Sequence, residues 1–137
     1  MPQNLGFDVE LRFPFNDAIG RVKDALKQEG FGILTEIDLQ AAFREKLGRE
    51  FRPYVILGAC NPALAHRAVS VDRQIGLLLP CNVVVRSAPN EAGAVIVDAM
   101  DPQIMVQVAD QPGLREVADD AAVKLHAAID TRAALTK

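Results

Sequence analysis

The sequence is poor in several residue types on which particular classes of protein depend. Among its 137 residues it has no Trp, one Tyr and two Cys. The scarcity of large aromatic side chains indicates an aliphatic core with a few Phe residues. Two cysteines do not make the disulfide framework of a small secreted domain, so we expect both thiols to be reduced.

Long hydrophobic runs and basic runs are also missing. The apolar runs extend over only a few residues, far short of the roughly 20 that cross a bilayer. The first residues, MPQNLGFDVELRF, have neither the positive start nor the apolar centre of a secretory signal. We therefore expect a soluble, cytoplasmic protein with no membrane partner. The net charge is -3 and no basic run is longer than two residues, which argues against a nucleic-acid partner.

The residue patterns of common catalytic sites are absent as well. The chain has no glycine-rich loop for a phosphate group, no CxxC or HExxH motif, and only two histidines. Two histidines alone do not support a Ser/His/Asp arrangement. The sequence therefore leans against an enzyme without excluding one, and we expect no cofactor.

The composition itself is that of an ordinary globular protein. Hydrophobic residues make up 50% of the chain and charged residues 24%, which argues against disorder. The length fits one domain over residues 1–137, with no internal repeat or linker to divide it.

Apolar patterns predict the strands. Apolar and polar residues alternate over residues 5–13, which predicts a half-buried strand. The segment Tyr54–Cys60 is almost entirely apolar and predicts a buried central strand. Further strands are predicted over residues 31–37, 75–79, 81–85 and 94–99. Pro80 separates the segments 75–79 and 81–85, because proline cannot donate to a sheet, and a turn at residues 89–93 precedes the last segment.

Capping residues and helical periodicity predict the helices. Asn16, Asp38 and Asn61 each precede such a periodicity and can accept from free backbone N–H groups. The expected helices extend from Asn16 to Gly30, over Leu39–Leu47 with Gly48 as its end, over Pro62–Val71, from Asp101-Pro102 to about residue 108, and from Leu114 onward for about 20 residues.

The apolar residues of these helices predict which sides are buried. Leu39, Phe43 and Leu47 recur every four residues in the second helix. In the third helix the expected buried residues are Leu64, Ala65, Ala68 and Val69, and in the last helix they are Leu114, Ala118, Ala121, Leu125, Ala128 and Ile129. The order of elements predicts an α+β fold with a mainly antiparallel sheet, helices packed on one face and a long C-terminal helix.

Several phrases resemble a known family. They are EGFGILTEID, LGREFRPYVILGACNPALAHRAV, IGLLLPCNVVVR and DAMDP, and the chain resembles domain-of-unknown-function family 302 over about residues 5–129. The resemblance implies a curved antiparallel sheet backed by helices, an arrangement like that of the TATA-binding protein. It also implies a homodimer. It supplies no reaction, substrate or ligand.

The two cysteines are the first candidates for a functional site. Cys60 precedes a helix capped by Asn61, and the positive end of that helix would favour its thiolate if the sulfur points there. Alternatively, Cys60 is a small apolar residue that closes a buried strand. Cys81 is followed by Asn82, as Cys60 is by Asn61. We hypothesise that both cysteines lie on neighbouring strands near one pocket, with the two Asn side chains as polar partners.

Other candidates flank this region. His66, with Cys60 and Cys81, is a weak candidate metal ligand, because the spacing matches no known metal motif, and we expect no metal. Arg52, Tyr54 and Arg73 have donors for a small anion, or are solvated residues beside buried strands. Asp38, Asp98 and Asp101 are interpreted as caps or strand-end residues.

Three functions remain open from the sequence. The first is a small dimeric module that binds an unknown small molecule or a partner near Cys60, Asn61 and Cys81. The second is a thiol-dependent redox or transfer enzyme centred on Cys60. The third is a structural dimerisation domain, for which the alanine-rich last helix would allow close helix packing.

Overall fold

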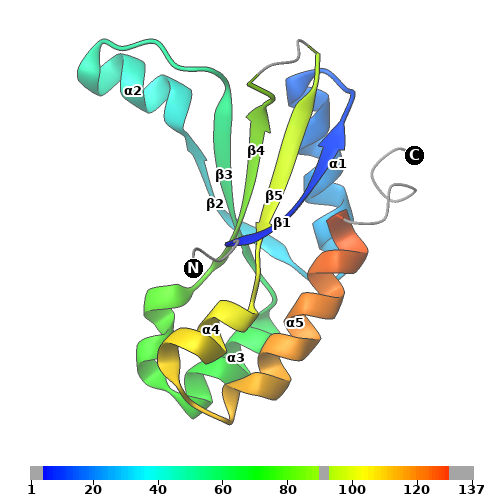
Figure 1. The fold of residues 1–137 in the computed structure, drawn as a ribbon, viewed down its shortest axis with the longest axis vertical. Helices are drawn as coiled ribbons and strands as arrows, with labels where there is room; N and C mark the ends of the chain where they lie inside the picture. Colours follow the sequence, from blue (N-terminus) through cyan, green and yellow to red (C-terminus); the bar gives the residue numbers. More distant parts are fainter. Residues whose placement is uncertain (1–4, 90–92, 130–137) are drawn as a thin grey trace.

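The computed structural model describes residues 5–89 and 93–129. Five antiparallel strands form one sheet in the order β1-β5-β4-β3-β2. Figure 1 shows that the sheet is twisted and that its outermost strands turn away from its centre. The strands are β1 (Gly6–Leu11), β2 (Gly32–Asp38), β3 (Tyr54–Cys60), β4 (Cys81–Ser87) and β5 (Val95–Met100). The predicted α+β class with a mainly antiparallel sheet is confirmed.

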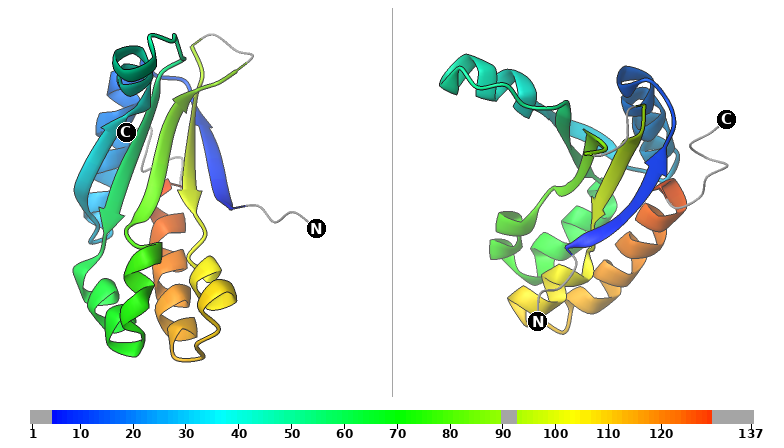
Figure 2. Two further views of the ribbon diagram at one scale, coloured as in Figure 1. Left: turned by 90° about the vertical axis from the view of Figure 1, so that its left-hand side faces the viewer. Right: turned by 45° about the horizontal axis from the view of Figure 1, so that its top comes forward.

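The helices fall into three groups around the sheet. They are α1 (Phe15–Gln28), α2 (Leu39–Leu47), α3 (Pro62–Val71), the 3-10 helix η1 (Arg73–Leu78), α4 (Gln103–Ala109) and α5 (Leu114–Ile129). Helices α1 and α5 lie against one face of the sheet, and α3, η1 and α4 gather at one end (Figure 1). Helix α2 projects from the opposite end, as the two views of Figure 2 show. None of the described helices is long and apolar enough to cross a membrane.

Strand alternation gives the sheet two different faces. On the face toward α1 and α5, Val9, Val97, Val85 and Val55 lie side by side across four strands, and all are buried. Successive side chains of a strand point to opposite faces. The residues that alternate with these valines along the strands therefore form the opposite surface. No helix of the described chain covers this surface, and we call it the open face.

A second core stabilises the helical end of the molecule. Its buried residues come from α3, η1, α4 and α5, and the largest are Leu64, Ile75, Met105 and Leu114. The side chain of Arg67 in α3 also donates to Asp120 in α5 at 2.9 Å. The helical end therefore has a core of its own, and α5 contributes to this core and to the one beneath the covered sheet face.

Two predicted helix caps are confirmed and one is wrong. The Asp38 side chain accepts from the Ala41 amide at 3.0 Å, and the Asn61 side chain accepts from the Leu64 amide at 3.2 Å. Gly48 ends α2 with φ 65°, a conformation that glycine adopts without strain. Asn16 is not a cap, because α1 already begins at Phe15.

The predicted strand over residues 75–79 is wrong. Residues 75–78 belong to η1, whose first turn forms because the Asp72 side chain accepts from the Gln74 amide at 3.0 Å. Ile75 then points into the second core instead of alternating between two faces. The predicted buried side of α3 is also partly wrong, because Val69 is 39% exposed.

Helix α2 has no buried residue, although its periodicity predicts a buried side. We call residues 39–51 the arm. Within it Leu47 is 64% exposed and Phe51 is 46% exposed. The rings of Phe43 and Phe51 contact each other edge to face, with centroids 5.0 Å apart. The arm therefore has its own small apolar contact but does not pack on the covered side of the sheet.

Strands β4 and β5 begin and end within two residues of the strands predicted over 81–85 and 94–99. The predicted turn at residues 89–93 includes residues 90–92, which lie outside the described residues. All six residues expected on the buried side of α5 are buried, and so is Val117. The continuation of this helix to about 20 residues also lies outside the described residues.

Candidate binding site

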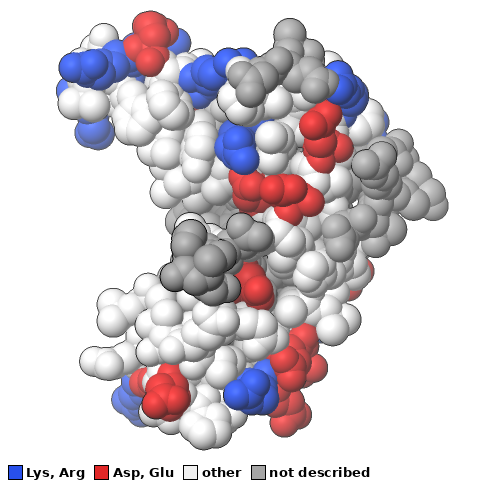
Figure 3. Space-filling view, viewed as in Figure 1, with Lys and Arg blue, Asp and Glu red and all other residues white. Residues whose placement is uncertain are grey.

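The open face carries a groove with a volume of about 830 Å³. The groove crosses β1, β5, β4 and β3 and reaches the start of α4. It is lined by Leu5, Gly6, Phe7, Asp8, Tyr54, Asn82, Val84, Asp98, Ala99, Met100 and Ile104. In Figure 3 the molecule is hollowed between the arm and the helical end, and acidic side chains gather on the sheet surface beside the hollow.

The floor of the groove is apolar at its centre. Val84 and Met100 lie on neighbouring strands and are half-buried, as is Ile104 beside them. Half-buried aliphatic side chains on an open sheet present an apolar surface to whatever enters the groove. They are therefore the residues to which the body of a small molecule would bind.

Two carboxylates and one guanidinium provide the charge. Asp8 and Asp98 are direct cross-strand partners. Arg86 donates from Nε to Asp98 Oδ2 at 2.7 Å and from Nη2 to Oδ1 at 3.5 Å. The hydrogen bond to Asp98 raises the pKa of Arg86, and the charges of Asp98 and Asp8 act in the same direction. Arg86 therefore stays protonated and is held by Asp98.

Two of the sequence candidates belong to this groove. Tyr54 and Asn82 both line it, from β3 and β4. Tyr54 is half-buried, and its ring lies 6.1 Å from that of Phe51 in the arm. The groove thus has an aromatic ring and an amide beside its carboxylates.

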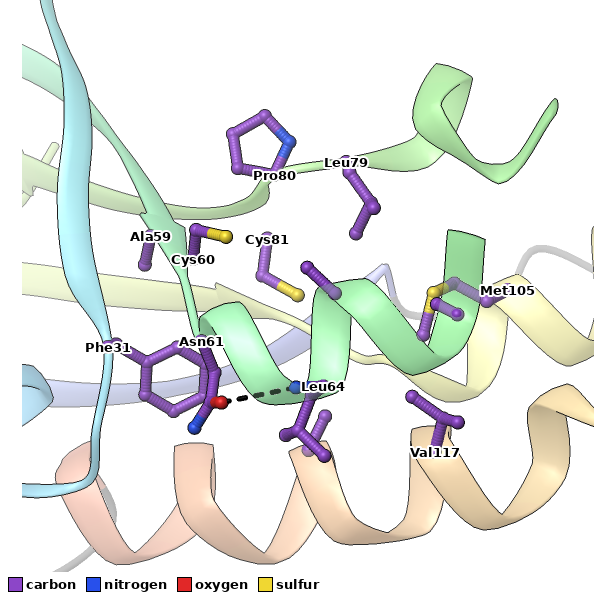
Figure 4. A pocket seen from close by; sticks show the side chains of 13 residues that line it. Phe31, Ala59, Cys60, Asn61, Leu64, Leu79, Pro80, Cys81, Met105 and Val117 are labelled. Carbon is purple, nitrogen blue, oxygen red and sulfur yellow. Dashed lines mark hydrogen bonds between the residues drawn. The ribbon is translucent and has the colours of Figure 1, made fainter. Parts of the chain in front are cut away.

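The two cysteines and Asn61 line a different and much smaller cavity, between the end of the sheet and α3. Its volume is about 20 Å³, enough for a water molecule but not for an organic ligand. Figure 4 shows the sulfurs of Cys60 and Cys81 beside this cavity, with the Asn61 side chain accepting from the Leu64 amide. Asn82 points away from it, into the groove.

The register places the two cysteines at the same end of neighbouring strands, with their side chains on different sides of the sheet. Cys81 is the cross-strand partner of Ala59, and both face the covered side of the sheet. Cys60 follows Ala59, so alternation directs its side chain to the other side. Both thiols are free, and burial, together with the nearby Cys60, raises the pKa of Cys81 to about 11.

The remaining sequence candidates do not join either site. Arg52 donates to the carbonyl oxygens of Pro89 at 2.7 Å and Ala88 at 2.9 Å, so it holds the end of β4. Arg73 is exposed at the start of η1, and His66 is exposed on α3. Among residues 5–89 and 93–129, no three His, Cys, Asp or Glu side chains are grouped to hold a metal ion.

Sequence reasoning missed Asp8, Val84 and Asp98. Asp98 was expected at a strand end, whereas it lies inside β5 and binds Arg86. The available signal was the alternation itself, because the polar residues between the apolar ones of β1 mark its outward side. That signal identifies Asp8 but does not reveal which strands lie next to it.

The raised pKa of Cys81 gives a stability prediction. The unfolded thiol titrates near 9.0 and the folded one at about 11. Because the folded pKa is the higher one, the contribution of this group is complete below pH 9 and is lost as the pH rises to about 11. The expected loss is about 2 to 3 kcal/mol of unfolding free energy.

Urea unfolding between pH 8 and pH 11 measures this loss. The Cys81→Ala variant should show a shallower decrease with pH than the wild type. Cys60→Ala should stay close to the wild type, because burial is the larger cause of the raised pKa of Cys81 and Cys60 the smaller one. An identical decrease in wild type and Cys81→Ala would show that the Cys81 thiol does not cause it.

The fold and sequence both agree with known proteins. The profile of the DUF302 family, a domain of unknown function, matches residues 7–132. The crystal structure of an uncharacterised conserved DUF302 protein from Bacillus stearothermophilus has a TM-score of 0.83 and 34% sequence identity, covering 92% of this chain and 96% of that one. No curated protein matches the chain. The family predicted from the sequence is therefore confirmed, and the chain belongs to the DUF302 family.

Proposed function

We propose that this protein is a binding module that holds a small organic molecule in the groove of the open face. The observation that supports this function is the groove itself, about 830 Å³ in volume and lined by Val84, Met100 and Ile104 with a few polar groups. Ligand sites in proteins are commonly concave, of about 300 to 1,000 Å³, and apolar with a few placed polar side chains.

The cavity beside the two cysteines is a poorer candidate, both for binding an organic molecule and for thiol chemistry. Its cavity of about 20 Å³ has no room for an organic substrate beside Cys60. The buried Cys81 thiol, with its pKa of about 11, is protonated at neutral pH and is a weak nucleophile. The groove is therefore the better candidate.

Filling the groove with a large side chain should weaken binding. Val84 lies at its centre, so the indole of Val84→Trp would occupy the space of a ligand. A panel of small cationic, anionic and neutral aromatic compounds can be screened by methyl NMR. Compounds that bind are expected to shift the methyl resonances of Val84 and Ile104, and their affinity should fall roughly tenfold or more in Val84→Trp.

The matched control is Val123→Trp. Val123 is 70% exposed on α5, and α5 packs on the other side of the sheet. The control should bind as the wild type does. Compounds that shift only resonances outside the groove, or that bind Val84→Trp undiminished, would contradict the proposed site.

The arm supports a second proposal, that two copies of the chain associate through it. A nine-residue helix with no buried residue gains little from its own contacts, because isolated helices of this length are marginal in water. The side chain of Arg44 is already paired with Glu50 at 3.0 Å. Leu47 and Phe51 are exposed and can form an apolar contact with a second copy. A twofold contact between two arms would leave the groove accessible.

A charge on the arm should weaken this dimer. In a twofold contact each Leu47→Glu substitution acts twice, so the dimer dissociation constant should rise roughly tenfold or more. Sedimentation equilibrium measures it, with Leu77→Glu as the control because Leu77 is 84% exposed on η1, far from the arm. A wild-type protein that stays monomeric at high micromolar concentration, or a Leu47→Glu dimer of unchanged affinity, would contradict the contact.

We also propose a reducing, cytoplasmic location for this protein, which its free cysteines support. Cys60 is half-buried and Cys81 is buried, and neither forms a disulfide. Proteins that work in oxidising compartments commonly rely on disulfides, whereas cytosolic thiols stay reduced.

A further inference from the structure

The charges around the groove indicate what kind of molecule it holds. The cross-strand pair Asp8 and Asp98 places two carboxylates next to each other on the floor. Like charges directly opposite each other destabilise a sheet. Arg86 offsets only part of this repulsion, because its guanidinium is bound to Asp98. The negative charge of Asp8 is therefore only partly compensated by Arg86, which acts on it without a direct ion pair.

No other cation compensates for Asp8 within the described chain. No Lys or Arg is among the described residues that line the groove. Arg12, the residue that follows β1, pairs with Glu10 at 3.1 Å. Arg52 is bound to backbone carbonyls at the end of β4. A cation that enters the groove would therefore meet a carboxylate that no basic side chain of residues 5–89 or 93–129 pairs with.

The rest of the lining suits the apolar part of such a molecule. Val84 and Met100 form the centre of the floor, and Leu5 and Ile104 lie toward α4. Tyr54 lines the groove on the side of the arm and adds an aromatic ring to the lining there. An anionic ligand would find no unpaired cation among the described residues of the groove, because the guanidinium of Arg86 already binds Asp98.

We propose that the groove binds an organic cation, an amine or quaternary ammonium group attached to an apolar body. This inference rests on the proposed function and adds the ligand class. The cationic group lies beside Asp8, and the apolar body lies on Val84 and Met100. The ion pair of Arg86 with Asp98 joins β4 to β5 and reduces the repulsion between the two carboxylates.

Three probes of nearly equal size and shape test the ligand class. They are 2-phenylethylamine, which is cationic at neutral pH, the neutral 2-phenylethanol and the anionic phenylacetate. Their affinities are measured by methyl NMR titration at low and at high salt. The amine should bind about three- to tenfold more tightly than the alcohol, the alcohol more tightly than the carboxylate, and the preference for the amine should decrease with salt.

The variant Asp8→Asn removes the charge and keeps the size of the side chain. It should reduce amine binding to the level of the alcohol and leave alcohol binding unchanged. The control is Asp24→Asn, which removes one charge from an exposed residue of α1, on the covered side of the sheet. It should leave the preference for the amine intact.

The possible results separate this inference from the function on which it rests. Groove resonances that shift equally with all three probes, or an amine preference that persists in Asp8→Asn, would overturn the cationic ligand while leaving a binding groove. If none of the probes shifts groove resonances in the wild type, both the ligand class and the groove as a binding site are overturned.

Discussion

Successive side chains of a strand point to opposite faces of a sheet, and this protein covers only one of those faces with helices. Helices α1 and α5 bury the side that holds Leu57 and Val97, both fully buried. The other side, with Val84 at its centre, stays half-exposed because the remaining helices lie at the two ends of the sheet. The groove, its charges and the unpacked arm all follow from this one-sided covering.

The same alternation separates residues that are adjacent in the sequence. Cys81 points to the covered side and is buried, whereas Asn82 points into the groove. On β5, Val97 belongs to the core and Asp98 binds Arg86 on the open face. A short stretch of chain thus serves both stability and the candidate site, and a shift of register by one residue would exchange the two roles.

The sequence predicted those parts of the structure that depend on local interactions. The caps Asp38 and Asn61 were predictable because a side chain and an amide three residues apart satisfy each other. The strand expected at residues 75–79 failed because an apolar run also fits a tight helix that packs on other helices. The groove was not predictable, because Asp8 and Asp98 are 90 residues apart and meet only through the pairing of β1 with β5. Local patterns show that Asp8 points outward but not what lies beside it.

Oxidation of the methionines tests directly whether the open face is accessible in solution. Met100 lines the groove and is half-exposed, whereas Met105, five residues later, is only 2% exposed in the second core. Hydroxyl-radical footprinting with mass spectrometry compares the two residues within one molecule. The account predicts that Met100 is oxidised much faster than Met105. Equal protection of both residues would show that the open face is covered in solution and would contradict the groove as a binding site.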